Sequence, residues 1–524
     1  MVNDSQRGRK IPMEEAINSI GFGKAQMKLA AITGFFVAAD AMEMMMLSFL
    51  GPAVKCEWNV DNAKLSLLTT VVFFGMLFGT YFWGILADRY GRWKALCYDC
   101  AFVFVFSIFS AVSPNYGTIL FARAMVGFGL GGFGVSWTYF FEFIPTIDRG
   151  RWASIMMGWW SLGTVLEAAL AWAIIPTLGW RWLLVISAAP LLLVFVAIQF
   201  IPESPRFYLI SGQMEKATEV LEEVAQQNGC HLPEGQIKPL DDMIKPSPLE
   251  VMKIILFNPS WQRLTMCLWT LWFANGFCYY GLVLMTTMLT YHDKGNVCDN
   301  NEIFTNSDYT AVFIATAAEL PGLALSFSIV DRIGRKLSQA LLFGGTAVFI
   351  FVLMPLDGQT QADVAVLFFA RMLITGSFTI TYLYTPEVYP TDIRGTAFGY
   401  ANAFARIGGM LCPFAAQDLF LGVGAWAAEL LLAVMAVAAT VASLYLPIET
   451  SGREMQDNLN EGSMVMKKMK SGALLNVNSE PLNPNSNAIY EEAEEGKGSQ
   501  NVIGDNENAL QLDSDGLAVE QNLH

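Results

Sequence analysis

Twelve apolar segments, each about 20 residues long, constrain the fold of this chain more than any other feature. In lipid, a backbone satisfies its hydrogen bonds only as a helix or a closed barrel, and continuous apolar runs of this length form helices. The sequence therefore predicts an all-α membrane protein. Its twelve spans lie near residues 27–50, 65–87, 95–113, 116–140, 153–176, 181–201, 261–290, 309–330, 337–355, 363–385, 397–419 and 424–446.

The composition excludes a soluble enzyme. The 524 residues are 54% hydrophobic and 15% charged, and the mean hydropathy is +0.40, whereas a soluble domain carries about 25% charged residues. More than half of the net charge of −15 lies after Met455, where 12 Asp and Glu face 4 Lys. No basic, aromatic-rich segment predicts nucleic-acid binding. No phosphate-binding loop of the ATPase type occurs, so the sequence does not predict ATP as a source of energy.

Cysteines and histidines predict neither a metal site nor a cofactor. The eight cysteines are too few for a disulfide scaffold. Cys56 and Cys298 fall in predicted outer loops at near-equivalent repeat positions, which allows a disulfide between them. The histidines, His231, His292 and His524, are dispersed, so we expect no metal cluster.

Lys and Arg residues orient the spans. Basic clusters follow the second, fourth and eighth spans, for example Arg89, Arg92 and Lys94, and such loops stay in the cytosol. Both termini are then cytosolic. The first span carries Asp40 and Glu43, and no small-residue cleavage site clearly follows it, so we interpret it as a retained helix rather than a signal peptide.

The longest polar segment between spans, residues 202–260, separates the first six spans from the last six. Within it an apolar pattern at helical spacing predicts an amphipathic surface helix, through Met214, Ala217, Val220, Leu221 and Val224. The acidic tail is too polar to bury a core, so we expect it to be disordered. The predicted parts are a cytosolic N-terminus (1–26), a six-helix bundle (27–201), a cytosolic linker (202–260), a second six-helix bundle (261–446) and the cytosolic tail (447–524).

The two sets of six spans repeat each other. Asp88-Arg89-Tyr90-Gly91-Arg92 returns 243 residues later as Asp331-Arg332-Ile333-Gly334-Arg335. Glu142-x-x-Pro145-x-x-x-Arg149 returns 245 residues later as Glu387-x-x-Pro390-x-x-x-Arg394. Loops between apolar helices often contain Gly and Arg. That tendency alone explains one of the matches, but it does not explain why the matches share nearly the same offset. Two parallel halves imply a pseudo-twofold axis along the membrane normal and a cavity between the halves that rocking can close on either side.

Several motifs resemble a known superfamily. The loop Gly84-x-x-x-Asp88-Arg89-x-Gly91-Arg92 resembles the signature loop of the major facilitator superfamily, and Pro202-Glu203-Ser204-Pro205-Arg206 is similar to its sugar-porter-like branch. Gly163-Thr164-Val165-Leu166-Glu167 and Glu319-Leu320-Pro321-Gly322 resemble the synaptic vesicle two-related and organic-ion transporters. The resemblance covers residues 17–453. It implies the major facilitator fold, twelve helices in two pseudo-symmetric bundles.

Charged residues inside the spans are functional candidates, because a charge in the bilayer is costly unless it faces water or a partner. The acids are Asp40, Glu43, Glu167 and Glu319, and the bases are Arg123, Arg371 and Arg406. Because the acids outnumber the bases, we expect a cavity that favours protons and a cationic or zwitterionic solute. Internal salt bridges that hold helices together are the alternative interpretation.

The resemblance implies a proton switch in the first half. In proton-coupled relatives an Asp of span one pairs with the Arg that opens the R-x-x-x-G-x-G motif, and Asp40 and Arg123 match those positions. Breaking that pair would leave a desolvated acid that takes up a proton. Asp40 is therefore expected to couple protons through Arg123, and direct binding of solute by Asp40 is the alternative.

The resemblance also indicates solute-binding residues. Asn275-x-x-x-Tyr279-Tyr280 resembles the sugar-porter pattern in which the Asn binds solute and the tyrosines help to close the outer gate. Aromatic faces attract cations, although Trp and Tyr also populate membrane interfaces. The candidate solute-binding residues are Glu43, Trp160, Glu167, Asn275, Tyr279, Glu319, Tyr382 and Arg406.

The repeated loops carry the candidate gate. In the family, the acid and the base of the signature loop hold the cytoplasmic face closed against neighbouring helix ends. This assigns gating to Asp88, Arg92, Glu142 with Arg149, Asp331, Arg335, Glu387 and Arg394. The alternative, that these charges only set orientation, does not explain their doubling at a common offset.

The sequence therefore favours a secondary active transporter of a small organic ion, working by alternating access and coupled to protons. We expect a monomer in a lipid bilayer, in an intracellular synaptic-like vesicle or the plasma membrane. A membrane protein that keeps the carrier fold but serves as a non-transporting vesicle component or receptor is the second hypothesis. The charged residues inside the spans argue against this hypothesis, because a protein that no longer transports a solute has no need of such costly buried charges.

Overall fold

The computed structural model describes residues 10–233, 235–238, 246–292, 304–356 and 360–451. The expected disorder of the tail therefore concerns residues that lie almost entirely outside this part of the chain, and Cys298 lies outside it too. Cys56 is disulfide-bonded.

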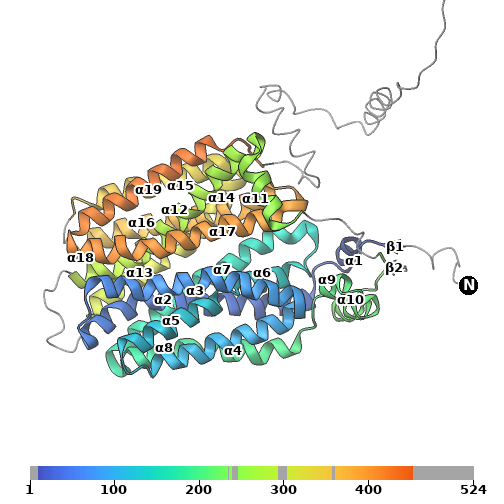
Figure 1. Cartoon of the computed structure of the whole chain (residues 1–524), viewed down its shortest axis with the longest axis horizontal. Helices are drawn as coiled ribbons and strands as arrows, with labels where there is room; N and C mark the ends of the chain where they lie inside the picture. Colours follow the sequence, from blue (N-terminus) through green and yellow to red (C-terminus); the bar gives the residue numbers. More distant parts are fainter. Residues whose placement is uncertain (1–9, 234, 239–245, 293–303, 357–359, 452–524) are drawn as a thin grey trace, which may run out of the picture. The chain divides into compact units, whose positions relative to one another are not determined.

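The first half has six spans, which are coloured from blue to green in Figure 1. The fourth span is two helices, because the chain turns at Gly131 and Gly132 between α5 and α6. The short 3₁₀ helices η1 (Thr146–Asp148) and η2 (Ile198–Phe200) follow α6 and α8. The spans are α2 (Lys24–Trp58), α3 (Asn62–Tyr90), α4 (Arg92–Ala111), α5 (Tyr116–Leu130) with α6 (Phe133–Phe141), α7 (Arg149–Leu178) and α8 (Trp180–Ala197).

The second half also has six spans, but here the divided span is the second one, which consists of α13 (Asn306–Ala317) and α14 (Glu319–Ile333). The π-helix η4 (Phe414–Leu419) and α18 (Phe420–Gly422) continue its fifth span. The other elements are α12 (Pro259–His292), α15 (Arg335–Leu353), α16 (Thr360–Val388), α17 (Thr391–Pro413) and α19 (Ala425–Tyr445).

One span differs in character from the others. Within the described residues, eleven spans are long and apolar enough to cross a membrane, and α17 is not among them. This helix carries Arg394 and Arg406 together with Asn402 and several glycines. It packs against α12 and α3, so neighbouring helices rather than lipid surround much of it. With α17, the described chain has the twelve spans that the sequence predicts.

Glycines set the hairpins and the closest helix contacts. Gly91 joins α3 to α4 with φ 109°, and Gly334 joins α14 to α15 with φ 85°, a region that favours glycine. Close contacts between helices at glycine residues also occur in both halves. A Cβ on Gly163 would lie 2.2 Å from the carbonyl oxygen of Ala38, and one on Gly408 would lie 2.3 Å from that of Phe273.

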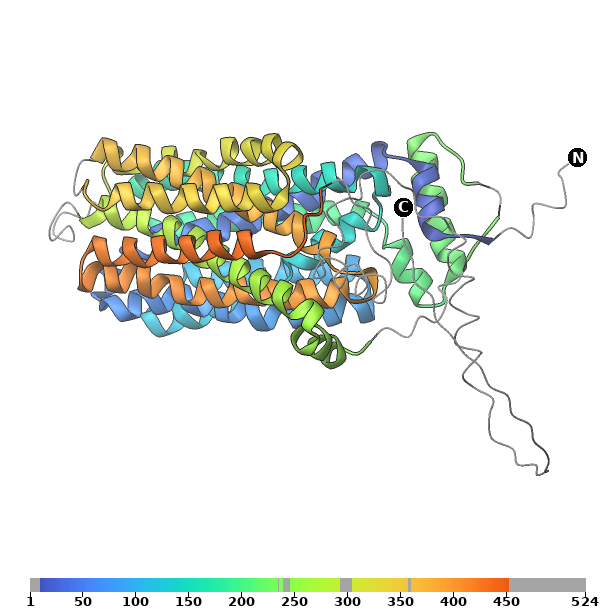
Figure 2. The same cartoon turned by 90° about the horizontal axis from the view of Figure 1, so that it is seen from above.

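Short elements cover one end of the spans (Figure 2). They are β1 (Lys10–Ile11), α1 (Met13–Ile20), α9 (Pro205–Ile210), α10 (Met214–Asn228), β2 (Gln236–Ile237) and α11 (Pro248–Phe257). The strands β1 and β2 pair in parallel, with Lys10 opposite Gln236. The amphipathic helix expected in the linker is α10, which buries Ala217, Val220, Leu221, Val224 and Ala225.

A matched pair of glycines on α17 tests the packing. We expect Gly408→Ala to destabilise the protein by about 1–3 kcal/mol, because its methyl group would overlap the backbone of α12. Gly399→Ala, where a Cβ meets nothing within 4 Å, should be neutral or slightly stabilising. Thermal unfolding of purified protein measures both, and equal midpoints for the two variants would contradict the packing described here.

Candidate functional site

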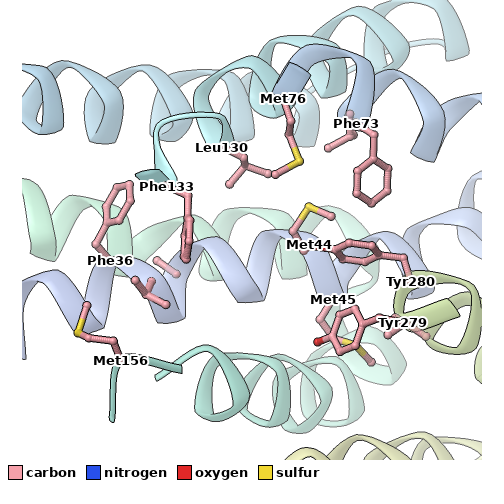
Figure 3. Close-up of a cluster of buried hydrophobic side chains, with 14 of the residues drawn as sticks. Phe36, Met44, Met45, Phe73, Met76, Leu130, Phe133, Met156, Tyr279 and Tyr280 are labelled. Atoms are coloured by element: carbon pink, nitrogen blue, oxygen red, sulfur yellow. The ribbon is translucent and has the colours of Figure 1, made fainter. Parts of the chain in front are cut away.

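A cavity with about 500 Å³ of empty space lies between the two halves. Its wall is largely aromatic and comes from α6, α7, α12, α16 and α17. Of the candidate solute-binding residues, Trp160, Tyr279, Tyr382 and Arg406 line it. Figure 3 shows Tyr279 and Tyr280 of the second half beside Met44 and Met45 of α2, with Phe73 of α3 close to Tyr280.

Arg406 is the charged side chain on this wall. It is only 7% exposed. Its guanidinium interacts with the Tyr280 hydroxyl, and its Nη1 lies 3.9 Å from the sulfur of Met76. Its Nε has no hydrogen-bond partner, and Arg406 forms no ion pair within the described residues. The cavity therefore presents an unpaired positive charge among aromatic faces.

The acids expected near the solute do not line the cavity. Glu319 pairs with Arg371 at 2.7 Å. Glu167 accepts a hydrogen bond from Ser187 at 2.7 Å, on α8 and away from the cavity wall. A count of acids against bases along the sequence therefore does not give the charge on the cavity wall.

Asn275 is also satisfied within its own half. Its amide nitrogen donates to Thr381 at 2.8 Å, and its amide oxygen accepts from Ser377 at 2.9 Å. The residue is fully buried between α12 and α16 and does not line the cavity. A direct contact of Asn275 with solute would require a change in this packing.

The expected pairing of Asp40 with Arg123 is wrong for this conformation. Arg123 pairs instead with Glu43 at 3.0 Å and donates to Ser110 at 3.0 Å. Glu43 also accepts a hydrogen bond from Ser107. Glu43 lies three residues, about 4.5 Å, further along α2 than Asp40, and its longer side chain reaches Arg123. Neither oxygen of Asp40 has a hydrogen-bond partner.

A hydrogen-bonded chain joins the two halves beside the cavity. Trp160 of α7 donates to the hydroxyl of Tyr279 at 2.9 Å, and Tyr279 donates to Glu319 at 3.0 Å. Thr164 of α7 donates to the other Glu319 oxygen at 3.0 Å. Two further bonds cross between α3 and α17, from Ser66 to the Pro413 carbonyl and from Thr70 to the Met410 carbonyl. The halves must break these bonds to separate on this side.

The candidate gate residues form two equivalent clusters. Arg92 pairs with Asp88 at 3.1 Å and with Glu142 at 3.2 Å. Arg335 likewise pairs with Asp331 and with Glu387, each at 3.2 Å. Glu142 also accepts a hydrogen bond from Ser204, as Glu387 does from Thr450. Each cluster ties together helix ends of its own half.

Two residues that motif analysis did not assign to the gate complete these clusters. Glu203 accepts a hydrogen bond from the backbone N–H of Trp93 at 3.0 Å, and Glu449 accepts one from that of Arg335 at 2.8 Å. Both therefore cap the N-terminus of the helix that follows the signature loop, where a negative charge is favourable. Burial raises the pKa of Glu203, against the opposing effect of these backbone donors. The signal was their shared position, just before Ser204 and Thr450.

The expected partnership of Glu142 with Arg149 is also wrong. Arg149 donates to the carbonyl of Ile144 at 3.3 Å and pairs with Glu14 of α1 at 3.5 Å. Arg394 similarly donates to the carbonyl of Tyr389 at 3.1 Å. Each arginine lies four residues after a proline and donates to the carbonyl five residues before it, rather than to the acid of the motif.

Sequence reasoning missed Asp99. It lies in α4 within a predicted span and is 1% exposed, and neither of its oxygens has a hydrogen-bond partner within the described residues. The rule that an intramembrane acid is a functional candidate applies to it as it does to Asp40. Its position between Cys97 and Cys100 in an apolar run was the available signal.

Comparisons with known proteins agree with this architecture. The family described as "Sugar (and other) transporter" matches residues 20–458. The chain belongs to this family. It is a transporter by family and not an enzyme, and a multi-pass integral membrane protein.

Two relatives are similar over most of the chain. The "Organic cation/carnitine transporter 7" of Arabidopsis thaliana is 37% identical over 490 residues, which cover 86% of this chain and 97% of that protein. The "Synaptic vesicle 2-related protein" of Xenopus laevis is 40% identical over 464 residues, which cover 85% of this chain and 82% of that protein.

Solved structures confirm the predicted major facilitator fold. A D-xylose-proton symporter superposes with a TM-score of 0.64 at 17% identity, covering 82% of this chain and 100% of that chain. The inward open conformation of the xylose transporter XylE from E. coli gives 0.63 at 16% identity, covering 85% and 99%.

The ion pair between Arg149 and Glu14 predicts how the stability of α1 depends on pH. Burial acts to raise the pKa of Glu14, but the positive charges of Arg149 and Arg206 outweigh it and lower the pKa. A carboxylate with a lowered pKa stabilises the folded state above its unfolded pKa, and this contribution is lost as the pH falls through the folded pKa. We expect Glu14→Gln to speed hydrogen exchange in α1 at neutral pH.

The control for this variant is Glu219→Gln on α10, whose carboxylate makes no ion pair within the described residues. The difference between wild type and Glu14→Gln should disappear at acid pH, once exchange is corrected for its intrinsic rate. A difference that persists there would assign the effect to something other than the charge of Glu14.

Proposed function

We propose that this transporter carries a small organic zwitterion that bears a carboxylate, and that it does so by proton-coupled alternating access. The observation that carries the proposal is the unpaired Arg406 on the wall of the cavity. A guanidinium in a site shielded from water binds a carboxylate in two parallel hydrogen bonds. The solute's carboxylate would supply the ion pair that the protein itself does not make.

The aromatic wall fits the remainder of such a solute. Trp160, Phe378 and Tyr382 line the cavity with Arg406. Their faces attract an ammonium group when water is excluded. One Arabidopsis relative is named an organic cation/carnitine transporter, and carnitine has both a carboxylate and a quaternary ammonium group. We therefore favour a zwitterion over a simple cation.

Asp40 offers a physical route for coupling. Its negative charge interacts with the positive charge of Arg406, so protonation of Asp40 and binding of a carboxylate to Arg406 affect each other. A solute carboxylate on Arg406 adds negative potential near Asp40 and favours its protonation, and a protonated Asp40 leaves Arg406 free for the solute. Solute and proton then bind together and leave together, which gives symport.

Alternating access would use the contacts already described. Opening the outer side requires the chain from Trp160 through Tyr279 to Glu319 to break. The cytoplasmic clusters around Arg92 and Arg335 keep each half rigid while the halves rock. The names of the synaptic vesicle 2-related relatives favour a vesicle membrane, and the plasma membrane is the alternative.

Arg406 is tested with two solutes in reconstituted liposomes. We expect Arg406→Gln to reduce uptake of labelled L-carnitine about 10- to 100-fold, because hydrogen bonds between charged groups contribute about 1.5–3 kcal/mol. Arg263→Gln, at an exposed arginine outside the cavity, is the control and should retain uptake. Wild-type protein that is folded but moves neither carnitine nor other zwitterions would favour the non-transporting vesicle component instead.

Asp40 is tested by separating driven uptake from exchange. We expect Asp40→Asn to abolish accumulation driven by an imposed pH gradient and to retain exchange of solute at equal pH, because only the net cycle needs proton release. Equal loss of both activities would remove the coupling role and leave Asp40 as a structural or solute-binding residue.

A further inference from the structure

A threonine on the cavity wall has a hydroxyl without a partner. Thr375 of α16 lines the cavity and is 7% exposed. Its Oγ1 makes no hydrogen bond within the part of the chain that the structure describes. Thr379, Thr381 and Thr385 of the same helix each donate to the carbonyl four residues earlier, a common way for a Thr in a helix to satisfy its hydroxyl. Thr375 departs from this pattern at the cavity wall.

Thr375 shares a helical face with aromatic residues of the wall. Phe378, Thr379 and Tyr382 lie three, four and seven residues after it, which places them on the same side of α16. All four side chains line the cavity. The ring centroids of Phe378 and Tyr382 are 5.4 Å apart. The side chain of Thr375 therefore belongs to the surface that would contact the body of a solute.

The same wall connects Thr375 to Arg406. The ring centroid of Phe378 lies 5.7 Å from that of Tyr279, which lies 5.0 Å from that of Tyr280. The Tyr280 hydroxyl interacts with the Arg406 guanidinium, and all of these residues line one cavity with about 500 Å³ of empty space. A solute held by its carboxylate on Arg406 therefore has Thr375 among the groups around the rest of the molecule.

The hydroxyl of Thr375 gains a partner only when something enters the cavity. Burying a hydroxyl without a hydrogen bond carries a free-energy cost. A Thr in a helix has two favoured χ1 rotamers, so an unbonded hydroxyl can turn toward an incoming group. It can donate one hydrogen bond and accept others. A hydroxyl on the solute offers both a donor and an acceptor, and it is the simplest group that matches.

We propose that Thr375 is a specificity-determining residue that hydrogen-bonds a hydroxyl of the solute and thereby makes the cavity stereoselective. The solute then meets the protein at three places: its carboxylate at Arg406, its ammonium group at the aromatic wall and its hydroxyl at Thr375. Three separate contacts around a chiral carbon distinguish mirror-image molecules, whereas two do not. The inference rests on the proposed function and narrows it to zwitterions that carry a hydroxyl on a chiral carbon.

The test compares three solutes that differ only at this hydroxyl. L-Carnitine and D-carnitine are mirror images, and γ-butyrobetaine is the same molecule without the hydroxyl. Isothermal titration calorimetry measures their affinity for the purified full chain in lipid nanodiscs, and liposomes measure their uptake. We expect wild type to bind one enantiomer about 2- to 10-fold more tightly than the other enantiomer and than γ-butyrobetaine, which corresponds to one hydrogen bond between neutral groups.

Thr375→Val removes the hydroxyl and keeps a branched side chain of similar size. We expect it to bind all three solutes with nearly equal affinity, close to that of wild type for γ-butyrobetaine. Folding should be retained, because the substitution removes a buried hydroxyl that has no partner. Thr375→Ser keeps a hydroxyl and should keep the preference, which a role in packing alone would not predict.

Thr379→Val is the matched control. Thr379 lines the same cavity, but its hydroxyl already donates to the carbonyl of Thr375 at 3.0 Å. We therefore expect this variant to keep the preference for one enantiomer, whatever the substitution does to the rate of uptake.

Three results would overturn the proposal. One is wild-type protein that binds the three solutes equally, a comparison that needs no variant. Another is Thr375→Val that keeps the wild-type preference. The third is Thr379→Val that loses the preference as completely as Thr375→Val does, which would assign it to the general shape of the wall. Wild type that binds none of the three solutes would contradict the proposed function and this inference together. Binding with the expected preference but without uptake would support Thr375 and contradict transport alone.

Discussion

The cost of placing a charge inside a membrane organises this structure. Two arginines in the spans are neutralised by acids, Arg123 by Glu43 and Arg371 by Glu319. Breaking a buried ion pair by removing one partner costs about 3–5 kcal/mol, so these pairs fix how the helices of each half meet. Arg406, Asp40, Asp99 and Glu167 make no ion pair within the described part of the chain. The spans thus contain charged groups that hold helices together and charged groups that have no ionic partner.

The fold could be predicted from the sequence because it depends on patterns that are visible in a single sequence. The thickness of the bilayer sets the length of each span, so spans can be recognised in a single sequence. The signature loop occurs twice because the two halves repeat each other, and this repeat is visible in the same sequence. The doubling of the charged loops was predictable for the same reason, whereas the partner of Glu142 was not, and the gating role stays a prediction. Arg92 and Arg335 each meet two acids, and the two sets occupy corresponding helix ends.

The site was less predictable because it depends on side-chain reach across helices. Asp40 and Glu43 lie on one face of α2, and only the packing of α4 and α5 decides that Glu43 meets Arg123. Asn275 has the residue type of a solute ligand, but Ser377 and Thr381 of α16 use both its polar ends. A count of charges along the sequence likewise cannot tell which groups line the cavity, and the charged side chain on its wall is Arg406.

The polarity of α17 has a consequence for how the protein is made. A segment with two arginines, an asparagine and many glycines is a poor substrate for independent insertion by the translocon, whose recognition depends on the apolarity of each segment. Its stable partners, α12 and α3, are synthesised earlier. We therefore expect α17 to enter the membrane against these two helices, so that the cavity wall that carries Arg406 is completed only after α17 is made.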